Sequence, residues 1–342
     1  MVPKICITMG DPAGIGSEII AKALAREEVY TKCRPVVIGD AQAIRDGIRI
    51  GGVNLKVNAI DDIEKAAFSN GTIDVYDLKN IDMNNLTYGK VDQQCGKAAG
   101  QYIETAVDMA MNKKVHAIVT APIHKEAFDL GGYGKNYRGH TEMLAALSGT
   151  EQVAMVLAHG NLRVIHVTTH VSLRKALDLI KQGRIYETIK IAVEACHQLG
   201  ISEPKLGIAG LNPHCGDGGI MGDEEVTEIA PAIERARSEG VNIDGPIPPD
   251  TIFPRGISGT YDIIVVMYHD QGHIPLKFHG FQWDGTKWKS VGGVNITFGM
   301  PIIRTSVDHG TAFGKAGKGT ADEKSLLDAI DYAITIAKNR NM

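Results

Sequence analysis

Strand-like apolar runs alternate with amphipathic helical stretches along almost the whole chain. The runs expected to form strands are residues 5–9, 35–38, 115–120, 152–157, 162–167 and 206–209. The stretches expected to form helices begin near Ser17 and then cover residues 98–111, 173–180, 185–199, 223–238 and 323–338. Parallel strands must be joined by a crossover, which is usually a helix, so this alternation predicts a largely parallel sheet with helices on both faces. The predicted fold class is therefore α/β.

The length of the chain implies more than one domain. At 342 residues it exceeds the ~250–300 residues at which single hydrophobic cores stop growing. No linker rich in proline or glycine divides it, and the last expected helix is placed to return to the N-terminal sheet. These features predict one domain made of residues 1–130 and 300–342, with a second α/β domain, residues 131–299, inserted into it.

Three histidines, His170, His214 and His269, each follow an apolar run. In open α/β sheets ligands bind beyond the carboxyl ends of the strands, so these side chains can converge although they are far apart in the sequence. Imidazole is the commonest ligand for borderline metal ions, and a catalytic site keeps about three protein ligands and an open position. The pattern predicts a three-histidine metal centre, with Asp217 and Asp270 as acceptors that orient the imidazoles. The remaining histidines are interpreted as structural or solvated; they include His116, His159, His166 and His197.

Composition and charge exclude several classes of protein. A formal net charge of -4 provides no electrostatic footprint for nucleic acid or for an anionic membrane surface. No apolar run approaches the ~20 residues that span a bilayer, and the N-terminus reads as a strand rather than a signal peptide. The five cysteines are scattered, which argues against a disulfide framework and for a reducing compartment. We therefore expect a cytoplasmic protein that binds neither nucleic acid nor membrane.

Two loops that precede expected helices are candidate anion sites. Residues 10–18 (GDPAGIGSE) lack both the GxGxxG spacing of a dinucleotide fingerprint and a Walker lysine. They form either a structural turn capped by Asp11 and Ser17 or a turn that faces a ligand. Residues 139–142 (GHTE) begin a later helix, where His140 or Thr141 could hold a phosphate or carboxylate, or Thr141 could act as a plain cap.

The last part of the chain adds an arginine and a glycine-rich loop. Arg304 lies in an apolar run whose end would aim its guanidinium into the cleft, where it suits a carboxylate or phosphate. Residues 308–322 are glycine-rich and precede the last expected helix. Such a loop can offer backbone N–H groups to a nucleotide, or can simply lead into the helix.

Together these segments resemble the 4-hydroxythreonine-4-phosphate dehydrogenase family of pyridoxal phosphate biosynthesis. The motifs are GDPAGIG (10–16), GHTE (139–142), TTH (168–170), LNPH (211–214), YHDQG (268–272), VNIT (294–297) and RTSVDHGTA (304–312). The resemblance covers essentially the whole chain. The loop at 308–322 and the first turn are also similar to those of the isocitrate and isopropylmalate dehydrogenases. This implies a two-domain α/β/α architecture with its active site in the interdomain cleft, and NAD bound without a Rossmann fingerprint.

The resemblance also implies roles for individual residues. It implies that His170, His214 and His269 bind a divalent metal (Zn, Mg, Mn or Co), one of them being supplied by the partner subunit of a homodimer. The implied substrate contacts are His140, Thr141, Lys277, Asn295 and Arg304. NAD is implied to associate with the discontinuous domain, through His309, Gly310, Thr311, Ala312 and Asp322.

The implied reaction is NAD-dependent oxidation of a secondary hydroxyl β to a carboxylate, followed by loss of CO2. A metal on the substrate oxygen would act as a Lewis acid. The acid/base that the chemistry also needs is Lys277, Asp250 or a metal-bound water. The first expected substrate is 4-phosphohydroxy-L-threonine, which would give 3-amino-2-oxopropyl phosphate.

Residues 272–277 (GHIPLK) and the insertion at 283–290 depart from the vitamin-pathway members. Both are closer to paralogues that oxidise D-threonate or D-erythronate 4-phosphate to dihydroxyacetone phosphate and CO2, which makes these substrates the alternative. Two other classes stay open: a non-redox metal hydrolase or lyase, and a phosphometabolite-binding protein without turnover.

Overall fold

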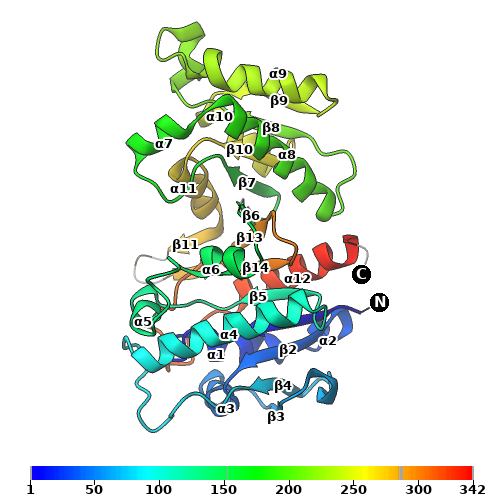
Figure 1. The fold of residues 1–342 in the computed structure, drawn as a ribbon, viewed down its shortest axis with the longest axis vertical. Coiled ribbons are helices and arrows are strands. Elements are labelled where there is room, and N and C mark those ends of the chain that lie inside the picture. The colour runs from blue at the N-terminus through cyan, green and yellow to red at the C-terminus, as the bar shows by residue number, and fades with distance from the viewer. Residues whose placement is uncertain (1, 152, 284, 286–287, 341–342) are drawn as a thin grey trace. The chain divides into compact units, whose positions relative to one another are not determined.

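The chain folds into two compact units (Figure 1). A computed structural model describes residues 2–151, 153–283, 285 and 288–340. The first unit consists of Met1–Val153 and Met300–Met342, and the second of Ala154–Gly299. The second unit begins after Val153, where we expected a boundary after residue 130, and it ends at Gly299. The reason is packing: α6 (His140–Leu147) contacts α4 (Gln93–Met111), so His140 and Thr141 belong to the first unit.

The sheet of the first unit is entirely parallel. Its strands are β1 (Lys4–Thr8), β2 (Arg34–Gly39), β3 (Lys56–Ile60), β4 (Thr72–Asp77), β5 (Ala117–Thr120) and β14 (Arg304–Val307). They lie in the order β3-β4-β2-β1-β5-β14. Because the order reverses between β1 and β5, the loops that follow these two strands flank a topological switch point, where doubly wound folds place their ligands.

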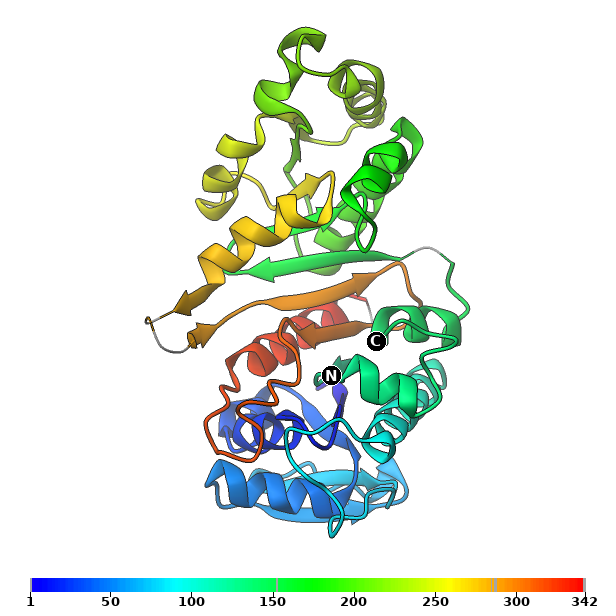
Figure 2. The ribbon, with the colours of Figure 1, turned by 90° about the vertical axis from the view of Figure 1, so that its left-hand side faces the viewer.

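Helices cover both faces of this sheet. They are α1 (Gly16–Leu24), α2 (Glu27–Lys32), α3 (Ala41–Gly51), α4, α5 (Lys125–Leu130), α6 and α12 (Lys324–Asn339). Figure 2 shows α1 and α12 on one side of the sheet and α4 on the other. The last helix packs on β5 and β14, so the C-terminal segment does return to the N-terminal sheet as predicted.

The second unit has a mixed sheet. Its strands are β6 (Ala154–His159), β7 (Leu162–His166), β8 (Leu206–Ala209), β9 (Ile243–Ile247), β10 (Ile263–Val266) and β13 (Val294–Phe298), in the order β13-β6-β7-β10-β8-β9. The expectation of a largely parallel sheet is wrong for β6, which is antiparallel to both β7 and β13. Only Gly160 and Asn161 separate β6 from β7, and a connection this short can form a hairpin but no crossover.

The helices of the second unit are α7 (Leu173–Leu179), α8 (Gln182–Gln198), α9 (Ala230–Ser238), α10 (Pro249–Ile257) and α11 (His269–Gly280). In Figure 2, α10 and α11 lie on one face of its sheet and α8 on the other. β11 (Phe281–Trp283) and β12 (Trp288–Val291) pair antiparallel in a separate two-stranded sheet, and residues 284, 286 and 287 of the polar insertion lie outside the described residues. Within the described ranges, we find no helix that combines the length and the apolar character needed to cross a membrane.

Candidate active site

Two of the three predicted metal ligands lie together in the second unit. His170 follows the end of β7, and His269 is the first residue of α11, directly after β10. Since β7 and β10 are adjacent parallel strands, their carboxyl ends meet at one edge of the sheet. The two imidazole rings are 5.7 Å apart between centroids. Both residues line a pocket of about 300 Å³, together with Thr169, Tyr268 and Asp270 among others.

The carboxylate of Asp270 orients His269 as predicted. Its Oδ1 lies 2.6 Å from Nδ1 of His269, so a proton on Nδ1 leaves the lone pair of Nε2 available for a ligand role. Asp217 is less well placed for the same task. Its Oδ2 lies 3.7 Å from Nδ1 of His214, which is too long for a hydrogen bond.

His214 lies in a loop of unusual backbone conformation after β8. Five consecutive residues, 214–218, adopt left-handed dihedrals, with φ of 52° at His214, 57° at Cys215 and 44° at Asp217. In the part of the chain that the structure describes, no three His, Cys, Asp or Glu side chains form a group that could hold a metal ion. The structure thus brings His170 and His269 together but not all three histidines, and the three-histidine centre stays a prediction.

Two further histidines lie behind this pair. His273 stacks on His269 with ring centroids 3.6 Å apart, and its Nδ1 lies 2.9 Å from the carbonyl oxygen of His269. The ring of His166, at the end of β7, is 4.8 Å from that of His273. Burial lowers the pKa of His273 to about 4 and that of His166 to about 3, and the neighbouring histidines add to both shifts. The i, i+4, i+8 spacing of His269, His273 and Lys277 on α11 was visible in the sequence and could have revealed this stripe.

A buried cationic group lies in the first unit. Arg304 is 3% exposed, and its Nη2 donates to Oγ1 of Thr120 at 2.9 Å. Arg304 begins β14 rather than ending a strand, which corrects its predicted position, but its guanidinium reaches Thr120 at the carboxyl end of β5. Burial lowers the pKa of Arg304 to about 10, an effect that the negative charge of Glu142 opposes. Arg304 is therefore a buried cation at neutral pH.

His140 and Thr141 lie in the first turn of α6, beside this cation. Burial, reinforced by the positive charge of Arg304, lowers the pKa of His140 well below its usual range. Its Nε2 is buried without a hydrogen-bond partner. Gly139 occupies the N-cap position of α6, and no side chain caps the helix there. Thr141 is therefore not the plain cap that we considered as an alternative. An anion at this helix N-terminus would face Arg304 and a neutral His140.

The turn at residues 10–18 joins β1 to α1 as expected, but its caps differ. The φ of Gly10 is 73°, and a Cβ there would lie 2.4 Å from the carbonyl oxygen of Pro122, so only glycine fits. Asp11 accepts from the N–H of Ala13 at 2.9 Å and therefore stabilises the turn and not the helix. Ser17 lies inside α1 rather than at its cap. Burial raises the pKa of Asp11 to about 6.

The predicted cofactor loop is attached to α1. The N–H of Ile15 donates to the carbonyl oxygen of Thr311, and Lys22 Nζ donates to those of Gly319 and Ala321. These contacts place Thr311 against the turn after β1, at the switch point. The other predicted cofactor residues, His309, Gly310, Ala312 and Asp322, belong to the same loop.

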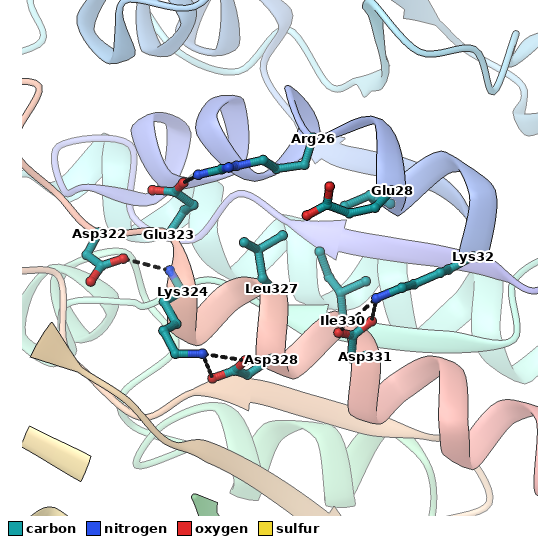
Figure 3. Close-up of a pocket in the computed structure, with 11 residues that line it drawn as sticks. Arg26, Glu28, Lys32, Asp322, Glu323, Lys324, Leu327, Asp328, Ile330 and Asp331 are labelled. Carbon is teal, nitrogen blue, oxygen red and sulfur yellow. Dashed lines mark hydrogen bonds and ion pairs between the residues drawn. The ribbon is translucent and has the colours of Figure 1, made fainter. Parts of the chain in front are cut away.

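Asp322 lines a separate pocket of about 440 Å³ beside α2 and α12 (Figure 3). The three basic side chains of that pocket are paired with acids: Arg26 with Glu323, Lys32 with Asp331 and Lys324 with Asp328. This surface is an ion-pair network in which each basic charge is already paired, and the acidic side chains outnumber the basic ones.

The remaining predicted site residues lie in the second unit. Lys277 is two turns beyond His269 on α11, and its charge adds to the lowering of the pKa of His273. Asp250 is exposed in the first turn of α10, and its charge contributes to raising the pKa of Cys215. Asn295 lies in β13, with Nδ2 3.0 Å from the sulfur of Met155 on β6. The charge of Lys277 thus acts on His273, one turn from His269, whereas that of Asp250 acts on Cys215, the neighbour of His214.

Comparison with known proteins identifies the family. Residues 31–333 match the family described as pyridoxal phosphate biosynthetic protein PdxA. D-threonate 4-phosphate dehydrogenase of Cupriavidus necator is 47% identical over 340 residues, which cover 99% of this chain and 98% of that protein.

Solved structures show the same relationship. A crystal structure named 4-hydroxythreonine-4-phosphate dehydrogenase from Klebsiella pneumoniae is 45% identical, with a TM-score of 0.85 over 98% of both chains. A β-decarboxylating dehydrogenase from Thermococcus kodakarensis shares the fold at 14% identity, with a TM-score of 0.50 over 97% of this chain and 83% of that one. The recognised family and the predicted fold class are thus confirmed, and this chain belongs to the PdxA family of dehydrogenases.

Proposed function

We propose that this dehydrogenase oxidises and decarboxylates a 4-phosphorylated 3-hydroxy acid with NAD and a divalent metal, and that D-threonate 4-phosphate is its preferred substrate. The observation that carries the substrate is the 47% identity, over 99% of the chain, to a protein of that name. This reverses the order of preference reached from the sequence. The second candidate, 4-phosphohydroxy-L-threonine, is supported by the 45% identity to the Klebsiella protein.

Anion binding is assigned to the first unit. The substrate carries a phosphate and a carboxylate, and Arg304 offers a planar donor that suits either. His140 and Thr141 in the first turn of α6 would add hydrogen-bonding groups and the positive end of the helix dipole. Because Arg304 is already held by Thr120, little side-chain freedom is lost when the anion binds.

The histidines of the second unit have the chemistry of a divalent metal site. Neutral imidazoles are suitable ligands, and Asp270 fixes the tautomer of His269 that presents Nε2. We assign the metal to His170, His269 and His214, one of them from the partner subunit. A bound ion would supply Lewis-acid polarisation of the substrate oxygen and would stabilise the charge that develops during decarboxylation.

Proton transfer is assigned to Lys277 or Asp250. The hydroxyl proton must leave as the carbon is oxidised, and the carbon that loses CO2 must gain one. Lys277 is supported by its place on the stripe of α11 with His269 and by its electrostatic effect on His273, whereas Asp250 is exposed on α10. Asn295 would contribute a polar contact to the substrate.

NAD binding is assigned to the loop of residues 308–322 and the turn after β1. The backbone link between Ile15 and Thr311 holds the loop at the switch point of the parallel sheet, where nucleotides bind in doubly wound folds. The cofactor would accept the hydride of the oxidised carbon.

A homodimer is supported by exposed apolar side chains near the histidine pocket. Ile274 and Phe278 on α11 are 66% and 90% exposed, and Leu173 and Leu177 on α7 are 59% and 42% exposed. Leu173 itself lines the pocket with His170 and His269. Large apolar side chains exposed on the two helices that follow His170 and begin at His269 are typical of a protein interface.

The test is NADH formation by the metal-reconstituted protein with D-threonate 4-phosphate, D-erythronate 4-phosphate or 4-phosphohydroxy-L-threonine. We expect the highest kcat/KM with D-threonate 4-phosphate, together with release of CO2. A higher kcat/KM with the amino acid substrate would place the enzyme in the vitamin pathway. No NADH from any of the three would contradict the proposed reaction.

A further inference from the structure

We propose that Glu225 is a positioning residue that holds His214 in place for its role as a metal ligand. The proposal rests on the metal centre assigned above. It concerns a residue that sequence analysis did not select, since Glu225 lies eleven positions after His214 in a segment expected only to be helical.

The loop that carries His214 needs support from outside itself. The left-handed dihedrals of His214, Cys215 and Asp217 are unfavourable for residues with a Cβ, so these residues would relax if nothing opposed them. The loop is also exposed, and Asp217 is too far from the imidazole to orient it through a hydrogen bond.

The carboxylate of Glu225 supplies that support at the start of the loop. Glu225 is 3% exposed, and its Oε1 accepts from the backbone N–H groups of Leu211 and Asn212, both at 2.7 Å. Its Oε2 accepts from Nδ2 of Asn212 at 2.8 Å. A carboxylate has acceptors only, so both oxygens can be used in this way at once.

The same side chain also touches the middle of the loop. A Cβ on Gly216 would lie 3.1 Å from Oε2 of Glu225 and 2.7 Å from the carbonyl oxygen of Gly222, so the loop packs closely on the carboxylate. Glu225 in turn begins a π-helical turn, Glu225–Ile229, that continues into α9. π-helical turns are rare in proteins, and those that occur are often found at functional sites. Here the π-helical turn begins at the residue whose carboxylate contacts the His214 loop.

A second side chain links this loop to the segment of His269. Gln271 is 7% exposed; it donates from Nε2 to the carbonyl oxygen of Gly210 at 2.7 Å and accepts at Oε1 from the N–H of Met267 at 2.7 Å. The residue that precedes the His214 loop is thereby tied to the residues that precede His269. Glu225 then fixes the path from Gly210 to His214.

The chain offers a matched control. Glu224 is the neighbouring glutamate and accepts from the same Nδ2 of Asn212 at 2.7 Å, but it is half-buried and its hydrogen bond goes to a side chain of the loop rather than to the backbone. We would compare Glu225→Gln with Glu224→Gln in the full-length, metal-free protein and titrate Mn²⁺ by calorimetry. We expect Glu225→Gln to weaken Mn²⁺ binding by about 10–100-fold, and Glu224→Gln to weaken it less than about threefold.

A double-variant cycle with His214→Ala separates positioning from general damage. If Glu225 acts through His214, then adding Glu225→Gln to His214→Ala causes no further loss of Mn²⁺ affinity. An equal loss in both backgrounds would overturn the proposal. If Glu225→Gln does not fold, Gly216→Ala takes its place, because it disturbs the loop against the carboxylate without removing a buried charge; unchanged affinity in that variant would also overturn the proposal.

The metal centre and the role of Glu225 can be tested separately. If the wild-type protein binds no Mn²⁺, or if His214→Ala binds it as tightly as the wild type, the proposed metal centre is wrong. If His214→Ala loses affinity while Glu225→Gln and Gly216→Ala keep it, only the role of Glu225 is wrong.

Discussion

The two units of this chain present their candidate site residues in opposite ways. In the first unit the sheet is wholly parallel, Arg304 is buried, and its guanidinium already donates to Thr120 on the adjacent strand. In the second unit the sheet is mixed, and His170 and His214 are exposed on turns. Arg304 is thus buried and held by a neighbouring strand, whereas the imidazoles of His170 and His214 are exposed to solvent.

The two units also differ in the free-energy cost of holding these side chains in place. Burying a guanidinium is expensive, which is the reason that the pKa of Arg304 is lowered, and the cost is recovered when an anion arrives. The second unit instead stores strain in the left-handed backbone at His214, of order 1–3 kcal/mol per residue. The comparison predicts that anion binding depends on the first unit and metal binding on the second.

The largest effect is expected from His269→Ala. Loss of a metal ligand removes Lewis-acid stabilisation worth several kcal/mol, so kcat/KM should fall by about 10³-fold or more, and Mn²⁺ binding should weaken severely. The control is His279→Ala, an exposed histidine near the end of the same helix. Turnover by His269→Ala at the wild-type rate would contradict the assignment of His269 as a metal ligand.

Arg304→Lys should have the next largest effect. A lysine keeps the charge but not the planar donor, so we expect KM for the phosphorylated substrate to rise by about 10–100-fold. Mn²⁺ affinity in the absence of substrate should be unchanged, because that property belongs to the other unit. The exposed Arg34 serves as control through Arg34→Lys; an equal loss of Mn²⁺ affinity in Arg304→Lys would break the division between the units.

The pH dependence of stability should reveal His166. Its pKa is about 3 in the folded protein against 6.5 for an ordinary histidine. Between these two pH values the imidazole is protonated in the unfolded chain and neutral in the folded protein. The contribution of His166 to stability is therefore complete above pH 6.5 and is lost as the pH falls towards 3, by about 2 kcal/mol between pH 7 and pH 5. His273, with a pKa of about 4, adds a loss of the same sign.

Chemical denaturation of the metal-free protein at pH 7 and pH 5 measures this loss. His166→Gln should reduce the difference between the two pH values, and His197→Gln, at an exposed position, should leave it as in the wild type. The same difference in wild type and His166→Gln would show that other groups cause it.

The smallest effect is expected from Asp270→Asn. The amide can still accept from Nδ1 of His269 but no longer as a charged partner, so Mn²⁺ affinity should fall by about tenfold. Asp217→Asn should change it less, because that carboxylate is 3.7 Å from His214. An equal or larger effect of Asp217→Asn would mean that the loop of His214 closes when the metal binds.

Much of the fold was accessible from local patterns. The runs at 5–9, 35–38 and 206–209 correspond to β1, β2 and β8 within a residue or two, because an apolar run bounded by turns specifies a buried strand by itself. The pairing of β6 with β13 was not accessible in this way. It joins segments far apart in the chain, and no local pattern encodes which strand lies beside which.

The candidate site divides along the same line. The three histidines and Arg304 could be selected because polar residues after apolar runs are unusual, and the resemblance of several ordered motifs gave them roles. The contacts of His166 with His273 and of Glu225 with Leu211 could not, since each depends on how separate elements pack. His166 was interpreted as structural or solvated, and the structure shows it buried against the paired histidines.

By itself, then, the sequence determined the α/β class, the family and the positions of six of the strands and six of the α-helices, and it selected the residues to which we assign the chemistry, because these depend on local periodicity and on the order of motifs. The tertiary structure decided the boundary after Val153, the antiparallel β6, the burial of Arg304 and the left-handed loop of His214. These depend on packing and on hydrogen bonds between distant segments, whose free energies exist only once the chain has folded.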